Sequence, residues 1–164
     1  MNNKKIAVVF DVDGVFTDGT FWQNKNEKYL KRFGPDDFDA LDELRKHACI
    51  KLITADSKGF SIVHSRTMAK GLPLTLVSNK PKKRWRWIKD NLFDYYIIYV
   101  GDGIYDWYPL EMCDFGITTV DALPHVQDKA TYISPRTGAN RFVADVCLYV
   151  LKYFFEVDIC KIGQ

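Results

Sequence analysis

Asp11 and Asp13 have the spacing and setting that phosphoryl chemistry needs. They directly follow Ile6–Phe10, an apolar run rich in β-branched residues that predicts a buried strand. Gly14 lets the chain turn sharply and brings its backbone close to a ligand. Two like charges close together out of water are costly unless a cation joins them or one acid keeps its proton. The competing interpretation is two solvated loop acids beside a turn glycine.

These two acids can divide the work of hydrolysing a phosphate ester. Asp11 as nucleophile would form an aspartyl-phosphate, which splits one difficult displacement into two easier ones. Asp13 would protonate the departing oxygen and then deprotonate the attacking water. That second role needs a proton held at neutral pH, which a raised pKa in a crowded acidic site can supply.

A second acidic segment runs from Gly101 to Asp106, after the hydrophobic run Tyr96–Val100. Asp102 can join Asp11 around Mg²⁺, which prefers carboxylates, phosphate oxygens and water as ligands. Asp106 would lie about one turn further on and order the waters of the metal. The alternative is a turn followed by the acidic start of a helix.

Thr54 follows the apolar run Ile50–Ile53, where its hydroxyl can donate to a phosphate oxygen. The residues after it, Asp56 and Ser57, are each plausible helix N-caps. In the next segment Lys80 precedes Pro81, a residue typical of the first helical position. Lys80 there can place an ammonium group on the phosphate or beside the acids.

Two further lysines, Lys82 and Lys83, compete with Lys80 for that role. The whole run from 80 to 89 interleaves cations with tryptophans, which can also indicate a nucleic-acid or anionic-lipid surface. However, Trp85, Ile88 and Leu92 fall on one face of a helix, which favours packing on a sheet. The remaining cations would then form the solvated face.

The elements that position these residues alternate between strand and helix. This alternation predicts βαβ units and a three-layer α/β/α Rossmann-like fold with a central parallel sheet. Ligands bind such sheets beyond the carboxyl ends of the strands. The predicted strands are 6–10, 50–53, 74–77, 96–100, 115–118 and 130–133. The predicted helices are 38–46, 60–70, 81–92, 107–112 and 140–155.

The segment 20–33 departs from this pattern. It contains two short strand-like runs around the polar stretch 23–27, which predicts a β-hairpin projecting over the strand ends. The hairpin is too short for a separate domain, so residues 1–164 are expected to form a single domain.

Bulk composition narrows the classes of protein. A hydrophobic fraction of 47% argues against disorder, and a net charge of +2 indicates neither a nucleic-acid nor a membrane partner. No apolar run approaches the ~20 residues of a membrane span, and no signal-peptide core is present. The four scattered cysteines are typical of reduced thiols, so a cytoplasmic protein is expected.

Taken in order, the motifs make the chain resemble the haloacid dehalogenase superfamily of phosphohydrolases. The order is Asp-x-Asp-Gly, a threonine after the second strand, a lysine before a helix, and Gly-Asp-x-x-x-Asp. The resemblance is greatest to its capless tetrameric branch, which includes 3-deoxy-D-manno-octulosonate 8-phosphate phosphatases. Sialic-acid-type 9-phosphate phosphatases and the phosphatase-like domain of acylneuraminate cytidylyltransferases are similar too. Nearly the whole chain takes part, from Asp11 to Arg141.

The resemblance implies a role for each matching residue. Asp11 would be the nucleophile and Asp13 the acid and base, with Thr54 and Lys80 on the phosphate. Mg²⁺ would be held by the carboxylates of Asp11 and Asp102 and by the backbone carbonyl of Asp13. The supporting residues would be Asp106, Gly14 and Gly101.

The branch also implies a homotetramer without a cap domain, in which neighbouring subunits close the site. The hairpin would then serve assembly and closure, and Arg136 would reach a neighbour's substrate. The expected substrate is a small sugar phosphate of the octulosonate 8-phosphate or sialic-acid-type 9-phosphate class, in carbohydrate biosynthesis.

Three departures bear on the substrate. The branch usually has Thr-Gly-Arg where this chain has Thr54, Ala55 and Asp56. The usual pair of acids after Gly101 is reduced to Asp102 followed by a glycine. Phe38 replaces a glycine, which predicts a bulkier loop facing the substrate. These changes bear on the octulosonate assignment more than on phosphatase activity.

Two other functions compete with this one. The first is a catalytically weak, phosphatase-like oligomerisation module associated with a cytidylyltransferase pathway. The clustered acids argue against it, because an idle site has no need of them. The second is a nucleic-acid-binding domain using the run 80–89, which requires an exposed Trp85.

Overall fold

The computed structural model describes residues 4–163, and a six-stranded parallel sheet forms its centre. The strand order is β5-β4-β1-β6-β7-β8, and every neighbouring pair is parallel. In the central register, Val8 of β1 lies between Ile50 of β4 and Ile98 of β6. The strands are β1 (Ile6–Asp11), β4 (Cys49–Thr54), β5 (Leu74–Leu76), β6 (Tyr96–Val100), β7 (Phe115–Thr119) and β8 (Tyr132–Ser134). The predicted parallel α/β fold is confirmed.

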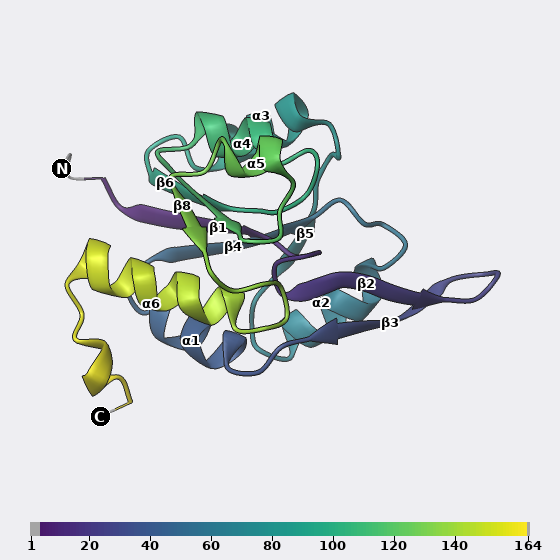
Figure 1. Cartoon of the computed structure of the whole chain (residues 1–164), viewed down its shortest axis with the longest axis horizontal. Coiled ribbons are helices and arrows are strands. Elements are labelled where there is room, and N and C mark those ends of the chain that lie inside the picture. The colour runs from purple at the N-terminus through teal and green to yellow at the C-terminus, as the bar shows by residue number, and fades with distance from the viewer. Residues whose placement is uncertain (1–3, 164) are drawn as a thin grey trace.

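Helices cover both faces of this sheet (Figure 1). One face carries α3 (Pro81–Asn91), α4 (Trp107–Met112) and α5 (Pro124–Gln127). The other carries α1 (Asp37–Leu44), α2 (Phe60–Met68) and α6 (Phe142–Phe155), and a short 3₁₀ helix, η1 (Ile159–Lys161), follows α6. The short α5 and η1 were not predicted. No helix within residues 4–163 is both long and apolar enough to cross a bilayer.

Successive side chains of β1 point to opposite faces of the sheet and so belong to two different layers of the core. Val8 and Phe10 pack with residues of α1 and α6, whereas Ala7 and Val9 pack with residues of α3. Since successive side chains of a strand point to opposite faces, Asp11 follows Val9 toward the α3 side. The alternation of side chains along β1 is thus enough to direct Asp11 toward α3.

Chain order reverses beside β1, which places a crevice at the site. The chain runs outward from β1 through β4 to β5, then returns to β6 on the other side of β1. Connections therefore leave the ends of β1 and β6 in opposite directions, and this switch point is where open α/β sheets bind ligands. Asp11 and Asp102 lie at the two strand ends that flank it.

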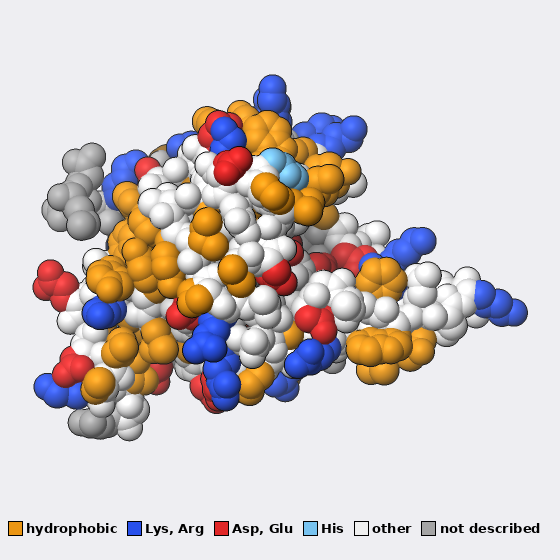
Figure 2. Space-filling model, viewed as in Figure 1, with side chains coloured by type: hydrophobic (Ala, Val, Ile, Leu, Met, Phe, Trp, Pro, Cys, Tyr) orange, Lys and Arg blue, Asp and Glu red, His pale blue; other side chains and the backbone are white. Residues whose placement is uncertain are grey.

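The predicted hairpin is confirmed and begins three residues earlier, at Thr17. It consists of β2 (Thr17–Gln23) and β3 (Lys28–Phe33), which pair antiparallel in a sheet of their own and project from the body (Figure 1). Hydrophobic side chains gather on it in Figure 2. Its exposed large hydrophobic residues are Phe21, Trp22, Tyr29 and Leu30.

Helix α3 settles the interpretation of the basic run. Trp85 is only 8% exposed and packs with Ile88 and Leu92 against the sheet. The nucleic-acid hypothesis required an exposed Trp85 for base stacking, so that hypothesis is wrong.

Candidate active site

Three carboxylates converge at the switch point. One oxygen each of Asp11, Asp102 and Asp106 lies within 4.8 Å of the others. Asp11 ends β1, Asp102 follows β6, and Asp106 is the buried residue that precedes α4. Two strand ends thus position Asp11 and Asp102, and the start of α4 positions Asp106. The structure brings together the acids that the sequence predicted.

Asp102 has an unsatisfied carboxylate oxygen. Its Oδ1 is buried without a hydrogen bond among the described residues. Gly14 is required beside it, because a Cβ at position 14 would lie 2.0 Å from Asp102 Oδ2, and Gly14 also has a φ of 84°. Carboxylate oxygens at this spacing, one of them unsatisfied, are the donor set that a hard divalent cation takes. The acidic cluster therefore fits a metal ion.

Burial makes this cluster electrostatically unfavourable without a cation. Desolvation raises the pKa of Asp11 well above its ordinary value, and Asp106, Asp102 and Asp13 raise it further while Arg84 opposes them. Desolvation likewise raises the pKa of Asp102, followed by the effects of Asp106, Asp121 and Asp13. A bound cation reverses this tendency, since it stabilises the ionised carboxylates.

Arg84 of α3 is the cation that lies among these acids. Its guanidinium is buried, and Nη1 donates to Asp106 Oδ1, to the Tyr99 hydroxyl at 3.1 Å and to Asp11 Oδ1 at 3.4 Å. Tyr99 Oη in turn donates to Asp106 Oδ1 at 2.7 Å. Gly101 makes room, because a Cβ there would lie 2.7 Å from Asp106 Oδ2.

Assigning every remaining cation of the run 80–89 to the solvated face was wrong for Arg84. Positions 84, 88 and 92 are spaced by four, so Arg84 shares the buried face with Ile88 and Leu92. That spacing was available in the sequence. What it could not show was the acid pair that compensates the buried charge.

The three candidate lysines lie elsewhere. Lys80 is the exposed N-cap of α3, and its backbone N–H donates to Ser78 Oγ at 3.1 Å. Lys82 and Lys83 are exposed too, and Lys82 lies over the Tyr108 ring. Within residues 4–163 none of their side chains forms an ion pair or hydrogen bond. The role of Lys80 as a phosphate ligand stays a prediction.

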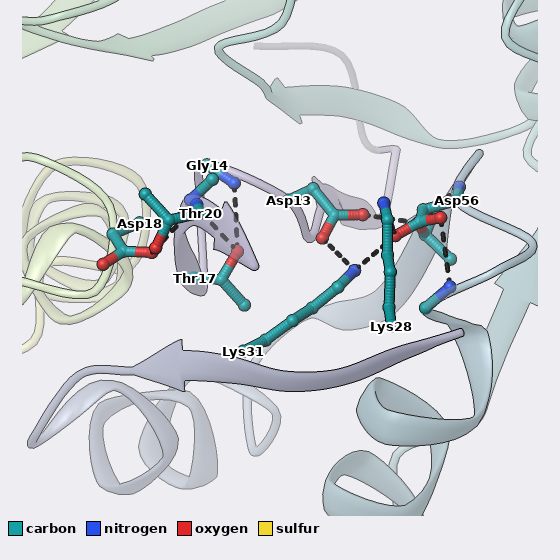
Figure 3. A network of polar contacts seen from close by, with 11 residues as sticks. Asp13, Gly14, Thr17, Asp18, Thr20, Lys28, Lys31 and Asp56 are labelled. Atoms are coloured by element: carbon teal, nitrogen blue, oxygen red, sulfur yellow. Dashed lines mark hydrogen bonds and ion pairs between the residues drawn. The ribbon is translucent and has the colours of Figure 1, made fainter. Parts of the chain in front are cut away.

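Asp13 sits in a second polar network, drawn in Figure 3. Its Oδ2 accepts a hydrogen bond of 2.9 Å from Thr54 Oγ1, and its Oδ1 accepts one from Lys31 Nζ. Thr54 Oγ1 also accepts the Asp56 N–H at 3.0 Å. The structure thus brings Asp13 and Thr54 together as predicted, and adds Lys31 from β3 of the hairpin, which sequence reasoning did not single out.

Asp56 forms ion pairs with two lysines of the hairpin. It accepts from Lys28 Nζ at 2.9 Å and from Lys31 Nζ at 2.7 Å, and it also accepts the Gly59 N–H at 3.0 Å (Figure 3). Although burial acts to raise it, the hydrogen bonds from Lys31 and Lys28 lower the pKa of Asp56 to about 2. Burial of Lys31 is likewise outweighed by Asp13 and Asp56, so its pKa is raised.

Two adjoining hollows open over these groups. The first, about 190 Å³, is lined by Asp11, Asp106 and Arg84 among others. The second, about 290 Å³, is lined by Phe21 and Lys28 of the hairpin and by Asn79. Both share Asp13, Asp56, Ala55, Arg84 and Tyr105. Asp11 and Asp106 therefore line only the first hollow, called the inner hollow below, and the hairpin residues line only the second, called the outer hollow. Arg84 lines both.

Two remaining expectations concern residues outside these hollows. Arg136 is exposed, its backbone N–H donates to Ser134 Oγ at 3.1 Å, and it lines neither hollow of its own chain. Phe38 does not face the substrate space as expected. It is 5% exposed and packs against Phe16 and Phe33, because its ring is better buried in the core.

Comparison with known proteins gives the same picture. No protein-family model matches the chain. A Legionella pneumophila hydrolase assigned to the haloacid dehalogenase superfamily is 25% identical, with a TM-score of 0.79 over 91% of this chain and 84% of that one. The parallel sheet, the acids at its switch point and this likeness make the chain similar to hydrolases of the haloacid dehalogenase superfamily.

Within that superfamily the chain is similar to 3-deoxy-D-manno-octulosonate 8-phosphate phosphatases. The Salmonella typhi enzyme is 26% identical over 162 residues, covering 96% of this chain and 84% of the relative. The structure of the Moraxella catarrhalis enzyme, with magnesium, phosphate and KDO bound, is 24% identical. It has a TM-score of 0.80 and covers 90% of this chain and 86% of that one.

Proposed function

We propose that this phosphomonoesterase hydrolyses a small acidic sugar phosphate of the octulosonate 8-phosphate or sialic-acid-type 9-phosphate class. Octulosonate 8-phosphate is the substrate named for the relatives. The inner hollow has the acids and Arg84 that a phosphoryl group needs, and the outer hollow offers Lys28, Asn79 and Asp56 to a polar leaving group. Asp56 in place of the usual arginine weakens the assignment to octulosonate 8-phosphate more than it weakens the assignment to a phosphatase.

The observation that carries this proposal is the cluster of Asp11, Asp102 and Asp106 around Arg84. Three clustered carboxylates, two of them on buried residues and the third with a buried, unsatisfied oxygen, are costly unless a cation joins them. Asp11, Asp102 and the Asp13 backbone carbonyl would hold Mg²⁺, the ion bound by the Moraxella relative. When bound, it would supply positive charge to the phosphoryl oxygens.

Asp11 carries the covalent step. An Asp11 carboxylate oxygen attacks phosphorus, the bond from phosphorus to the sugar oxygen breaks, and that oxygen takes a proton from Asp13. Water then attacks the aspartyl-phosphate and gives its proton to Asp13, and the bond from phosphorus to Asp11 breaks. Inorganic phosphate leaves, and both aspartates return to their starting states.

The other residues hold these two in place. The Thr54 hydroxyl and Lys31 fix the Asp13 carboxylate from two sides. Arg84 lies 3.4 Å from Asp11 Oδ1 and supplies the buried positive charge opposite the nucleophile. Lys80, which follows Asn79 of the outer hollow in the sequence, keeps its proposed role as a phosphate ligand.

We also propose the homotetramer of the capless branch, in the cytoplasm. The hairpin supports it, because Trp22 and Leu30 are cross-strand partners with roughly half of each side chain exposed, at 48% and 53%. Arg136 would then reach a neighbouring site. Light scattering should give the mass of four chains, and Trp22→Lys should reduce it.

The weak oligomerisation module is not favoured. Such a module has no physical need for buried, like-charged acids with raised pKa values. Hydrolysis of a generic aryl phosphate in Mg²⁺, lost in Asp11→Asn, would exclude it.

The experiment that tests the function is phosphate release from a panel of sugar phosphates with and without Mg²⁺. The panel includes octulosonate 8-phosphate, sialic-acid-type 9-phosphates, hexose phosphates and pentose phosphates. We expect metal-dependent release from one acidic sugar phosphate, abolished by Asp11→Asn. Absence of release from every substrate by a folded, Mg²⁺-binding protein would overturn the proposal in favour of the module.

A further inference from the structure

The starts of α1 and α6 meet in a strained junction. Asp36 and Arg141, the residues that precede the two helices, both adopt the left-handed conformation, with φ of 65° and 64°. Such a conformation is costly for residues other than glycine and persists where the surroundings impose it. Here Arg141 Nε donates to Asp36 Oδ2 at 2.5 Å, so an ion pair joins the two residues.

Asp37 completes this junction from inside the core. It is 1% exposed, and its Oδ1 accepts the Ala144 N–H of α6 at 3.0 Å. Helix α6 has no side-chain cap of its own at Arg141. Asp37, more than a hundred residues away in sequence, therefore takes the part of an N-cap for this helix, which leaves its Oδ2 without a hydrogen-bond partner among the described residues.

The loop just before α6 touches the catalytic loop and the hairpin base by backbone contacts. A Cβ at Gly138 would lie 2.1 Å from the Gly14 carbonyl oxygen and 2.3 Å from that of Thr17. A Cβ at Gly34 would lie 2.5 Å from the carbonyl carbon of Ala139. Residues 138–141 are thus wedged between the loop after Asp13 and the end of β3, with no side chain between them to absorb movement.

Phe38, next to Asp37, makes a second link between the same two regions. Its ring centroid lies 5.4 Å from that of Phe16, in the loop after Asp13, and 6.2 Å from that of Phe33, at the end of β3. The first turn of α1 therefore contacts the catalytic loop and the hairpin as well as α6.

We propose that Asp37 is a positioning residue for the active site. By capping α6 it fixes residues 138–141, and these in turn fix the hairpin that brings Lys31 to Asp13. Asp37 touches neither the acids nor the hollows, so its influence passes through Gly34, Gly138 and Phe38.

The titration of Asp37 supports this geometry. Burial raises the pKa of Asp37 to about 6; the Ala144 amide, Arg141 and the Val143 amide oppose the rise, and Asp36 adds to it. The Cys147 thiol of α6 also faces this carboxyl, and burial followed by the charge of Asp37 raises its pKa. Opening the junction returns Asp37 to its ordinary pKa, near 4. Opening is therefore least favourable below pH 4 and becomes easier as pH rises through 6.

Amide hydrogen exchange tests the proposal without relying on activity. After correction for intrinsic rates, we expect opening of residues 17–34 and 138–142 in the wild type to increase at least tenfold between pH 4.5 and 6.5. Asp37→Asn keeps an acceptor for Ala144 and should lose this pH dependence. Asp37→Ala should open both segments tenfold or more at every pH. Asp39→Asn, on the exposed side of α1, is the matched control and should match the wild type.

The enzymatic readout rests on the proposed function. Asp37→Ala should lower kcat for the sugar phosphate several-fold while leaving kcat for an aryl phosphate near the wild-type value, and Asp37→Asn should restore kcat for the sugar phosphate. Unchanged exchange in residues 17–34, or a uniform increase over the whole chain, would overturn the positioning role. Should Asp37→Ala fail to fold, the wild-type and Asn pH series decide alone. Loosening of the hairpin in a protein that hydrolyses no sugar phosphate would refute the proposed function and leave the positioning role standing.

Discussion

The two sides of the active site are built in different ways. On the body side, Asp11 ends the parallel strand β1 and Asp102 follows the parallel strand β6. Arg84 lies on the buried face of α3. On the hairpin side, Lys28 and Lys31 stand on a two-stranded ribbon that projects into solvent. A ribbon of this size is marginally stable by itself, whereas the central strands are held on both edges.

This difference matches the two halves of the reaction. Phosphoryl transfer depends on fixed charges, and the body side holds its charges at the ends of central strands and on the buried face of a helix. The leaving group differs between sugar phosphates, and the side that would face it is the more adaptable one. We infer that the body side determines the chemistry and that the hairpin determines which sugar is accepted.

The largest expected effect follows from removing the buried cation of the body side. Arg84→Met leaves Asp106 and Asp11 without their positive partner, so kcat should fall by 10²-fold or more for aryl and sugar phosphates alike. Steady-state kinetics with both substrates measures it. Arg86→Met, at an exposed position on the same helix, should leave kcat unchanged.

Lys80→Met distinguishes the contribution of Lys80 from that of Arg84, the other candidate for the positive charge at the phosphate. If Lys80 binds the phosphate, its loss should raise KM for every substrate by about tenfold, the effect of losing one charged hydrogen bond. A larger fall in kcat for Lys80→Met than for Arg84→Met would reverse the assignment of the catalytic charge.

A smaller and more selective effect is expected on the hairpin side. Lys31→Met removes one of the two donors that hold Asp13, the proposed acid. An aryl leaving group needs little protonation, whereas a sugar alkoxide needs it fully. Hydrolysis of the sugar phosphate should fall about tenfold and that of the aryl phosphate much less. Arg32→Met, exposed on the same strand, is the control, and equal losses on both substrates would contradict the division between the two sides.

The smallest effect concerns stability. Because the folded pKa of Asp56 is about 2, below its ordinary value, its charge stabilises the folded state above pH 4, and this contribution is lost as pH falls toward 2. Asp56→Asn should therefore cost on the order of 1 kcal/mol at pH 7 and little at pH 2.5, measured by denaturant unfolding. A cost that does not change with pH would mean that the ion pairs with Lys28 and Lys31 contribute nothing, and Asp90→Asn gives the baseline.

The body side was largely predictable from the sequence. Asp11, Asp102 and Thr54 each follow an apolar run, and parallel strands end at one edge, so their meeting followed from polarity alone. Arg84 was missed because a helix face that is mostly cationic predicts solvent exposure. Only the tertiary structure shows that two acids and a tyrosine compensate this one charge.

The hairpin side was predictable as an element but not as a set of contacts. Two strand-like runs around a polar turn predicted the hairpin, yet nothing local indicates that Lys31 reaches Asp13 and Asp56. The direction of a projecting ribbon depends on long-range packing at its base, here Gly34 against Ala139 and Phe33 against Phe38. Gly34 and Ala139 are 105 positions apart, so no local pattern in the sequence shows their contact.

Trapping the phosphorylated enzyme tests the central claim most directly. The protein is mixed with Mg²⁺ and its best substrate and is quenched in acid within the first turnover. It is then digested, and the masses of its peptides are measured by mass spectrometry. The account predicts the added mass of a phosphoryl group on the peptide that contains Asp11. The adduct should be absent in Asp11→Asn, and with an aryl phosphate it should accumulate in Asp13→Asn, where water is no longer activated. A phosphoryl group on any other residue, or full turnover by Asp11→Asn, would contradict the account.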